Sequence, residues 1–103
     1  MTRAVWKYDI PTADAATFAG YHTLIPAQAK FLNCAIQHDQ DLVSTWFEVE
    51  SEMPRVRRYF RVFGTGHTID DSRFSYLGTT LHFNGSLVLH LYTLYHPSEE
   101  ITS

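Results

Sequence analysis

Two apolar runs joined by Asn84-Gly85 constrain the fold more than any other part of this sequence. Residues 73–83 and 86–95 are rich in aromatic and branched side chains, and only this dipeptide separates them. Asn-Gly between such runs predicts a β-hairpin with a type I′ turn, because both central residues of that turn need a positive φ. A two-residue loop also sets the register, so we expect Leu81 to face Val88.

The two strands of this hairpin are apolar on both faces. Such a pair is either central in a layered structure or buried against another copy of the chain, and we favour a homo-oligomer. The expected interface residues are Leu87, Leu89 and Leu91. Trp46 shares its parity with Glu48, so it either anchors an interface or packs under a loop. One face of the hairpin holds Leu77, Leu81, Phe83, Val88, Tyr92 and Leu94, and the other holds Phe74, Tyr76, Leu87, Leu89 and Leu91.

The rest of the chain also alternates between apolar and polar residues with a period of two. Pro11 ends a first strand, residues 12–19 form a short helical turn or a loop, and Leu32, Cys34 and Ile36 are expected to face inward. The chain is therefore predicted to be all-β, a small antiparallel sandwich or partly closed barrel of six or seven strands, with at most one short helical turn near 12–19. Further strands are expected at 21–24, 29–37, 42–50 and 56–63, in a single domain at 1–96 followed by a mobile tail at 97–103.

Composition narrows the class of protein. The 103 residues carry a net charge of −3, which argues against bulk nucleic-acid binding. The lone cysteine, Cys34, excludes an intrachain disulfide, and its apolar surroundings favour a buried structural thiol. No membrane span and no signal peptide are apparent, so we expect a cytoplasmic protein without membrane contact.

An arginine-rich strand is the best local case for a binding site. Arg57, Tyr59 and Arg61 fall on one face at period two, whereas Arg58 shares the core side with Phe60. Guanidinium groups suit phosphates, and a tyrosine ring can stack on a base. The alternative is a solvated sheet face whose arginines pair with Glu48 or Glu50 on the preceding strand.

The strand runs into a turn made of Gly64, Thr65, Gly66 and His67. Two glycines one residue apart allow backbone amides to form an anion-binding concavity, which His67 would close. The alternative is a tight turn with a β-bulge, in which glycine supplies a positive φ. The segment lacks the lysine and the following helix of a phosphate-binding loop.

No catalytic constellation is apparent. The six histidines show no zinc-type spacing, and the adjacent acids Asp70 and Asp71 are expected to be solvated. We therefore expect no metal, no cofactor and no catalytic residue.

The overall pattern resembles a small, uncharacterised domain family carried by bacteriophages, prophages and actinobacterial genomes. The resemblance extends over roughly residues 5–94, and the matching segments are "WKYDIP" at 6–11, "IPAQAKFLNCAIQHD" at 25–39, "STWFEVE" at 44–50, "YFRVFGTGHTI" at 59–69 and "YLGTTLHFNGSLVLHLY" at 76–92. The resemblance implies a phage-type accessory protein in the cytoplasm of a bacterial host. It implies no biochemical activity.

These observations lead to three hypotheses of function. The first is a non-enzymatic binding protein that counteracts a host bacterial defence system, by occluding a host protein or by sequestering a cyclic or other anionic nucleotide. Its ligand contacts would be Arg57, Tyr59, Arg61, Gly64, Thr65, Gly66 and His67. The second is a phosphodiesterase that uses His67 with another histidine. The third is a structural or assembly module.

Overall fold

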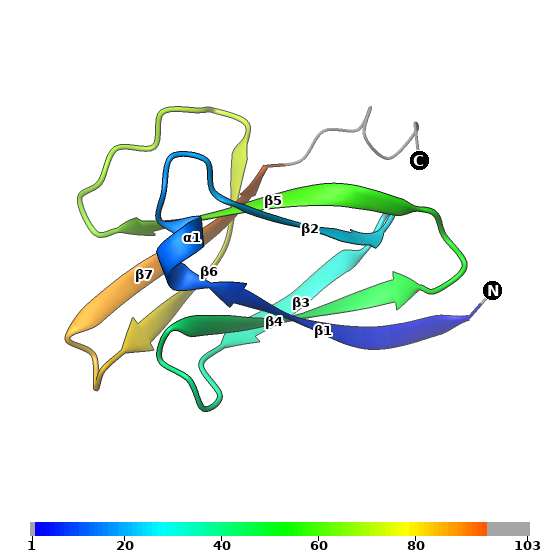
Figure 1. The fold of residues 1–103 in the computed structure, drawn as a ribbon, viewed down its shortest axis with the longest axis horizontal. Coiled ribbons are helices and arrows are strands. Elements are labelled where there is room, and N and C mark those ends of the chain that lie inside the picture. The colour runs from blue at the N-terminus through cyan, green and yellow to red at the C-terminus, as the bar shows by residue number, and fades with distance from the viewer. Residues whose placement is uncertain (1, 95–103) are drawn as a thin grey trace.

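The protein, whose structure is a computed structural model, consists of two antiparallel sheets that pack face to face (Figure 1). The structure describes residues 2–94, so the expected tail at 97–103 lies outside the described residues. The all-β sandwich expected from the sequence is confirmed. Its elements are β1 (Arg3–Pro11), α1 (Thr12–Ala15), β2 (Tyr21–Pro26), β3 (Lys30–Ala35), β4 (Leu42–Glu50), β5 (Arg55–Gly64), β6 (Phe74–His82) and β7 (Leu87–Leu94).

One sheet has the strand order β1-β4-β3 and the other has the order β2-β5-β7-β6. α1 connects β1 of the first sheet to β2 of the second, and Figure 1 shows it at one end of the sandwich. β3 also lies beside β6 without pairing with it, so the barrel is not closed. Among residues 2–94, no helix is long enough to cross a lipid bilayer.

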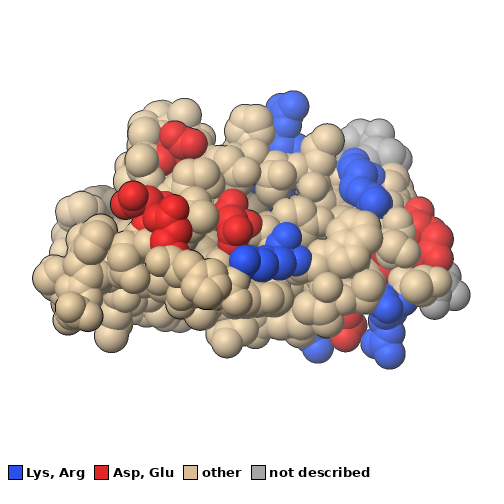
Figure 2. Space-filling model, turned by 60° about the horizontal axis from the view of Figure 1, so that its bottom comes forward, with Lys and Arg blue, Asp and Glu red and all other residues tan. Residues whose placement is uncertain are grey.

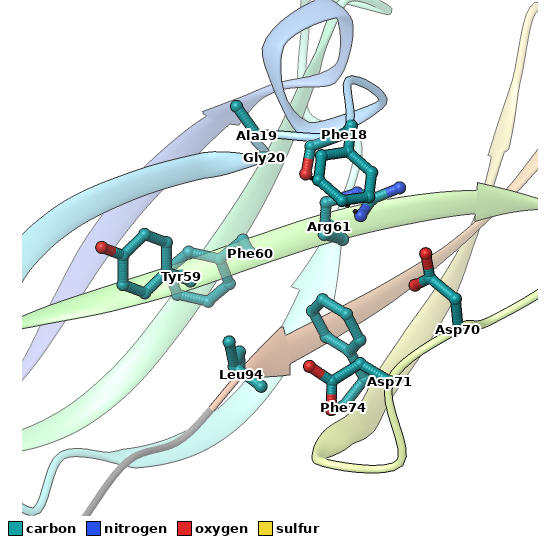
Figure 3. Close-up of a pocket in the computed structure, with 10 residues that line it drawn as sticks. All are labelled: Phe18, Ala19, Gly20, Tyr59, Phe60, Arg61, Asp70, Asp71, Phe74 and Leu94. Atoms are coloured by element: carbon teal, nitrogen blue, oxygen red, sulfur yellow. Dashed lines mark hydrogen bonds between the residues drawn. The ribbon is translucent and has the colours of Figure 1, made fainter.

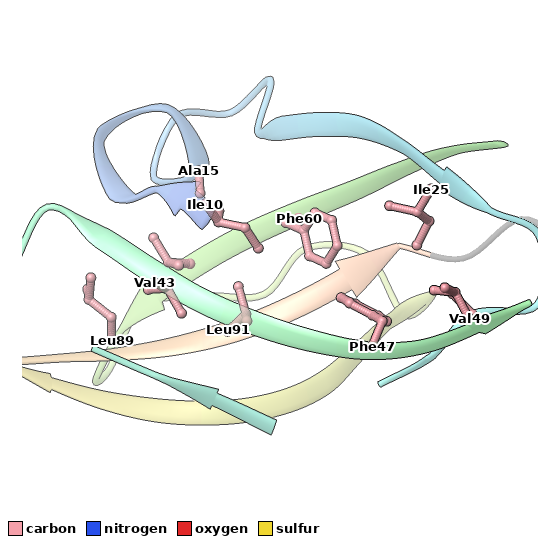
Figure 4. Packing of buried hydrophobic residues seen from close by; sticks show 11 residues of the cluster. Ile10, Ala15, Ile25, Val43, Phe47, Val49, Phe60, Leu89 and Leu91 are labelled. Carbon is pink, nitrogen blue, oxygen red and sulfur yellow. The ribbon is translucent and has the colours of Figure 1, made fainter. Parts of the chain in front are cut away.

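The hydrophobic core lies between the two sheets (Figure 4). Phe47 from β4 and Phe60 from β5 are fully buried, and their rings meet edge to face with centroids 6.2 Å apart. Ala15 of α1 is also fully buried and covers one end of this layer. Both sheets contribute through alternate residues, which is the period-two burial that the sequence predicts.

The Asn84-Gly85 hairpin has the predicted register. Leu81 pairs with Val88, and φ is +57° at Asn84 and +86° at Gly85. Phe83 also has a positive φ of +53°, which the sequence does not predict. The two faces of this hairpin differ in burial more than their composition indicates.

Leu89 and Leu91 point into the core of the chain itself. Leu91 is fully buried and Leu89 is 9% exposed, so neither side chain is available to a second copy. Their assignment to an interface between copies is therefore wrong. β7 is instead a central strand of a layered structure. β5 and β6 flank it, and the other sheet covers its inner face. Leu87, nearest the turn, is 42% exposed and remains available for contact.

Two β-bulges change which residues face the core. A register shift between Phe31 and Asn33 places Leu32 outward at 43% exposure, while Phe31 packs against the core. The expectation that Leu32 faces inward is therefore wrong. A second shift between Tyr76 and Gly78 turns Leu77 toward the core, although Leu81 on the same predicted face is 62% exposed. Each bulge inserts one residue into its strand. The residues that follow the bulge therefore face the opposite side of the sheet from the side that strict alternation predicts.

β4 and β5 follow each other in sequence but belong to different sheets. The arginines of β5 therefore cannot pair across a ladder with the acids of β4, and that alternative is wrong. Glu48 instead pairs with Arg3 of β1 at 3.3 Å. Arg58 does face the core side, as expected: its guanidinium lies 5.6 Å from the Phe47 ring centre and donates to the Ala29 carbonyl.

Candidate ligand-binding site

The outer face of the β2-β5-β7-β6 sheet carries two neighbouring cavities along β5. Arg57, Tyr59 and Arg61 point to this face, because their neighbours Phe60 and Val62 fill the core. β7 runs antiparallel beside β5, so Tyr92 lies next to Arg61 and His90 lies next to Phe63. The two cavities are named here the Arg61 pocket and the His67 pocket.

The Arg61 pocket has a volume of about 340 Å³ (Figure 3). The loop after α1 supplies Phe18 and Gly20, β5 supplies Tyr59 and Arg61, and the loop before β6 supplies two acids. Figure 3 shows Phe18 and Phe74 on opposite sides of Arg61. Three segments that are distant in sequence thus meet at one arginine. The complete lining is Phe18, Ala19, Gly20, Tyr59, Phe60, Arg61, Asp70, Asp71, Phe74 and Leu94.

Arg61 is surrounded by aromatic rings. Its guanidinium carbon lies 4.7 Å from the ring centre of Phe63, 5.8 Å from that of Phe74 and 5.9 Å from that of Phe18. Within residues 2–94 the group donates one hydrogen bond, from Nη1 to the Phe18 carbonyl at 3.3 Å. Its Nε is buried and has no acceptor there. A buried donor without a partner is costly, and such groups often mark functional sites.

Gly20 makes room for this arginine. A Cβ at Gly20 would lie 2.9 Å from Arg61 Cδ and 2.9 Å from the Phe60 carbonyl oxygen. Gly20 also has a φ of +71°, which disfavours any larger residue. The loop that carries Phe18 can therefore pass directly over β5.

The two acids of the Arg61 pocket differ in their partners. Asp71 forms a two-pronged pair with Arg73, at 3.1 Å to Nε and 2.8 Å to Nη2. This hydrogen bonding, together with the charge of Asp71, raises the pKa of Arg73. Within residues 2–94 Asp70 forms no ion pair. Because Asp71 already pairs with Arg73, the charged groups that the pocket presents to a ligand are the Arg61 guanidinium and the Asp70 carboxylate.

The His67 pocket has a volume of about 240 Å³ and includes the whole glycine turn. His67 N–H donates to the Gly64 carbonyl at 3.1 Å, and Gly66 has a φ of +89°, as a type II turn requires. The Gly64 amide, expected to bind an anion, instead donates to His67 Nδ1 at 3.2 Å. Neutral His67 therefore carries its proton on Nε2, which is left as a donor.

A chain of hydroxyl groups meets the His67 pocket at His90. Thr65 Oγ1 lies 3.0 Å from His90 Nε2, and Thr79 Oγ1 lies 2.9 Å from His90 Nδ1. Tyr76 contacts Thr79 in turn, at 2.5 Å between the two oxygens. Both ring nitrogens of His90 are thus occupied. This network orients Thr65 and His90 toward the cavity that they line with His67.

The structure divides the seven expected contact residues into three groups. Tyr59 and Arg61 line the Arg61 pocket, whereas the four residues of the glycine turn line the His67 pocket. Arg57 is exposed and lines neither cavity. Trp46 lies on the other sheet, half-buried between Lys7 and Asn33, so it is remote from this face. No group of three or more potential metal ligands occurs within residues 2–94.

A family model described as a domain of unknown function, DUF7352, matches residues 1–102. The chain belongs to this family. No curated protein and no solved structure matches the chain. The description of the DUF7352 family includes no activity, so the function of this member is inferred from its geometry. The phage setting implied by the sequence resemblance stays a prediction.

Sequence reasoning missed Phe18, Phe74 and Asp70 as members of one site in this DUF7352 protein. Phe18 is 85% exposed although it is a large apolar residue, and it lies in a segment expected to be a loop or a helical turn. Asp70 was expected to be an ordinary solvated turn residue. The signal in the sequence was Phe18 itself, the one aromatic residue in the segment of small and polar residues at 12–19.

Proposed function

We propose that this protein is a non-enzymatic binding protein that holds a small nucleotide on the outer face of the β2-β5-β7-β6 sheet. The observation that carries the proposal is the Arg61 guanidinium, which lines a cavity of about 340 Å³ and has a buried Nε without an acceptor. A bound ligand that brings acceptor atoms would pair with the guanidinium N–H groups that Arg61 presents to the cavity. Aromatic rings beside it suit a flat, unsaturated ligand.

The spacing of the two cavities suits a ligand with two chemically different ends. Arg61 and Gly64 are three residues apart on β5, which corresponds to roughly 10 Å along the strand, and Thr65 follows in the turn. The base would occupy the Arg61 pocket. The phosphate would lie at the His67 pocket, where the Thr65 hydroxyl and the His67 Nε2–H are donors.

In the setting implied by the sequence resemblance, such binding would sequester a nucleotide signal in the cytoplasm of a bacterial host and so counteract a defence system. Charged side chains lie scattered over a largely uncharged surface on the face drawn in Figure 2. Because the chain carries a net charge of −3, the proposed ligand is a small molecule rather than a nucleic-acid duplex.

The proposal is tested by thermal unfolding of the full chain in the presence of cyclic and linear mono- and dinucleotides. A ligand at 100 times its Kd adds about 2.7 kcal/mol to the free energy of unfolding. For a domain of this size that raises the melting temperature by roughly 10 °C or more. The ligand should be recovered intact after incubation. An unchanged melting temperature with every nucleotide tested would remove the proposal.

A phosphodiesterase is the second candidate, because His67 and His90 line the same cavity. Cleavage of a phosphodiester needs a proton acceptor and a proton donor, and two histidines can fill these roles once His90 Nε2 exchanges its bond with Thr65 for one to the substrate. This candidate predicts nucleotide turnover that disappears in His67→Ala. If chromatography shows only intact nucleotide after long incubation with wild-type protein, the binding function stands and the enzymatic one does not.

Occlusion of a host protein is the remaining form of the binding hypothesis. Along β6 and its turn, Tyr76, Leu81 and Phe83 are 55%, 62% and 52% exposed, which is an apolar surface at a sheet edge. The same residues, with Leu87, are also the available contacts for a homo-oligomer. Leu81→Asp should abolish either association in analytical ultracentrifugation or pull-down, while leaving nucleotide binding unchanged.

A further inference from the structure

Two polar side chains of the Arg61 pocket are opposite in charge. Arg61 offers N–H donors in a planar fork, and Asp70 offers two carboxylate oxygens without an ion-pair partner in residues 2–94. Figure 3 shows the Asp70 carboxylate entering from the loop that leads to β6, on the side of the pocket where Arg61 and Phe18 lie. A ligand edge that fits this pocket must carry acceptors for Arg61 and donors for Asp70.

The charge balance of the pocket also selects the ligand. Arg73 already pairs with Asp71, so the remaining charges of Arg61 and Asp70 cancel. A phosphate in this pocket would be attracted by one group and repelled by the other. A neutral base meets no such conflict, and it can lie against the aromatic side chains of Phe18, Tyr59 and Phe74.

From this pattern we propose that the Arg61 pocket is specific for guanine, a reading that rests on the nucleotide-binding function proposed above. Guanine presents two adjacent acceptors, O6 and N7, which an arginine fork binds with two hydrogen bonds. It also presents two adjacent donors, N1–H and the N2 amino group, which match the two oxygens of a carboxylate. Arg61 binds the first pair and Asp70 binds the second.

The other bases satisfy the same two residues less well. Adenine has one amino group, and its N1 acceptor would face the Asp70 carboxylate. Cytosine likewise places N3 beside its amino group, and uracil has a single N–H between two carbonyl groups. Each of them leaves Arg61 with fewer hydrogen bonds or sets a base acceptor against the Asp70 carboxylate, and the affinity falls accordingly.

The ligand-side test measures binding of GMP, IMP, AMP, CMP and UMP to the full wild-type chain by calorimetry. IMP lacks only the N2 amino group, so it reports on Asp70 without any change in the protein. We expect GMP to bind at least about 10-fold more tightly than AMP, CMP and UMP, since a good bidentate pair is worth about 1–3 kcal/mol. IMP should fall between GMP and the others.

The protein-side test uses Asp70→Asn, with Asp14→Asn as the matched control. Asp14 is an exposed acid on α1 and lines neither cavity. Asp70→Asn should remove the difference in affinity between GMP and IMP, and Asp14→Asn should preserve it. Asp70 is exposed, so the variant should keep the wild-type melting temperature without ligand.

The outcomes separate this inference from the function on which it rests. If all five mononucleotides bind with similar affinity, or if Asp70→Asn keeps the preference for GMP over IMP, guanine recognition is overturned and nucleotide binding stands. If no mononucleotide, cyclic nucleotide or dinucleotide binds the wild-type chain, both are overturned.

Discussion

Gly78 of β6 and Cys34 of β3 are in contact across the open side of the sandwich. A Cβ built on Gly78 would lie 2.6 Å from Cys34 Sγ. Gly78 directly follows the bulge in β6, and Cys34 follows the bulge in β3. The two irregular strands therefore approach more closely than two regular strands with side chains at both positions could.

Gly78→Ala should lower the free energy of unfolding by about 1–2 kcal/mol, because the added methyl group overlaps the thiol and forces Cys34 from its position. Urea unfolding measures the change. The matched test is the same substitution in a Cys34→Ala background, where no sulfur is present. If Gly78→Ala costs as much there as in wild type, the contact with Cys34 is not the cause.

His82→Ala should cost about 3 kcal/mol, which is more than any surface histidine. His82 is fully buried; its Nδ1–H donates to the Gln40 carbonyl, and its Nε2 accepts from the Thr80 hydroxyl, both at 2.7 Å. Removal of the ring leaves a cavity and two unpaired polar groups. His38→Ala, at an exposed position, serves as the control and should leave stability unchanged. Equal effects of the two substitutions in urea unfolding would contradict this account of His82.

The thiol of Cys34 should react slowly. Its burial raises its pKa, so less thiolate is present at a given pH than in an exposed cysteine. At pH 8 the native protein should react with iodoacetamide several-fold more slowly than a peptide containing "LNCAI". The rate in native protein should keep rising at alkaline pH beyond the point where the peptide rate levels off. If the native protein reacts as fast as the peptide, the thiol is not buried and its pKa is not raised.

The strands were predictable because their residues obey one local rule. In β4, Val43, Phe47 and Val49 lie on one face at the same parity and are buried, and Asn84-Gly85 determines a hairpin register without any tertiary information. The bulges at Leu32 and Leu77 were not predictable, since a single inserted residue leaves no mark in composition. Their effect is large, because each reverses the facing of the residues beyond it.

The residues of the candidate site likewise include some that the sequence predicts and some that it does not. Tyr59 and Arg61 were predictable from their parity on one strand. Phe18 and Asp70 were not, because they reach Arg61 from loops whose course depends on contacts such as the close approach of Gly20 to β5. The interface assigned to Leu89 and Leu91 failed for a related reason: alternation indicates that a strand has two apolar faces, but it does not say what covers each face.

A ligand site at Arg61 is tested by comparing Arg61→Gln with Arg57→Gln in calorimetric binding of the nucleotide that stabilises the wild-type chain most. Both arginines lie on the outer face of β5, but only Arg61 lines a cavity. Arg61→Gln should weaken binding by about 10-fold or more, since hydrogen bonds to charged groups are worth about 1.5–3 kcal/mol. Arg57→Gln should leave the affinity within about twofold of wild type. Equal losses in the two variants, or an unchanged affinity in Arg61→Gln, would contradict a ligand site at Arg61.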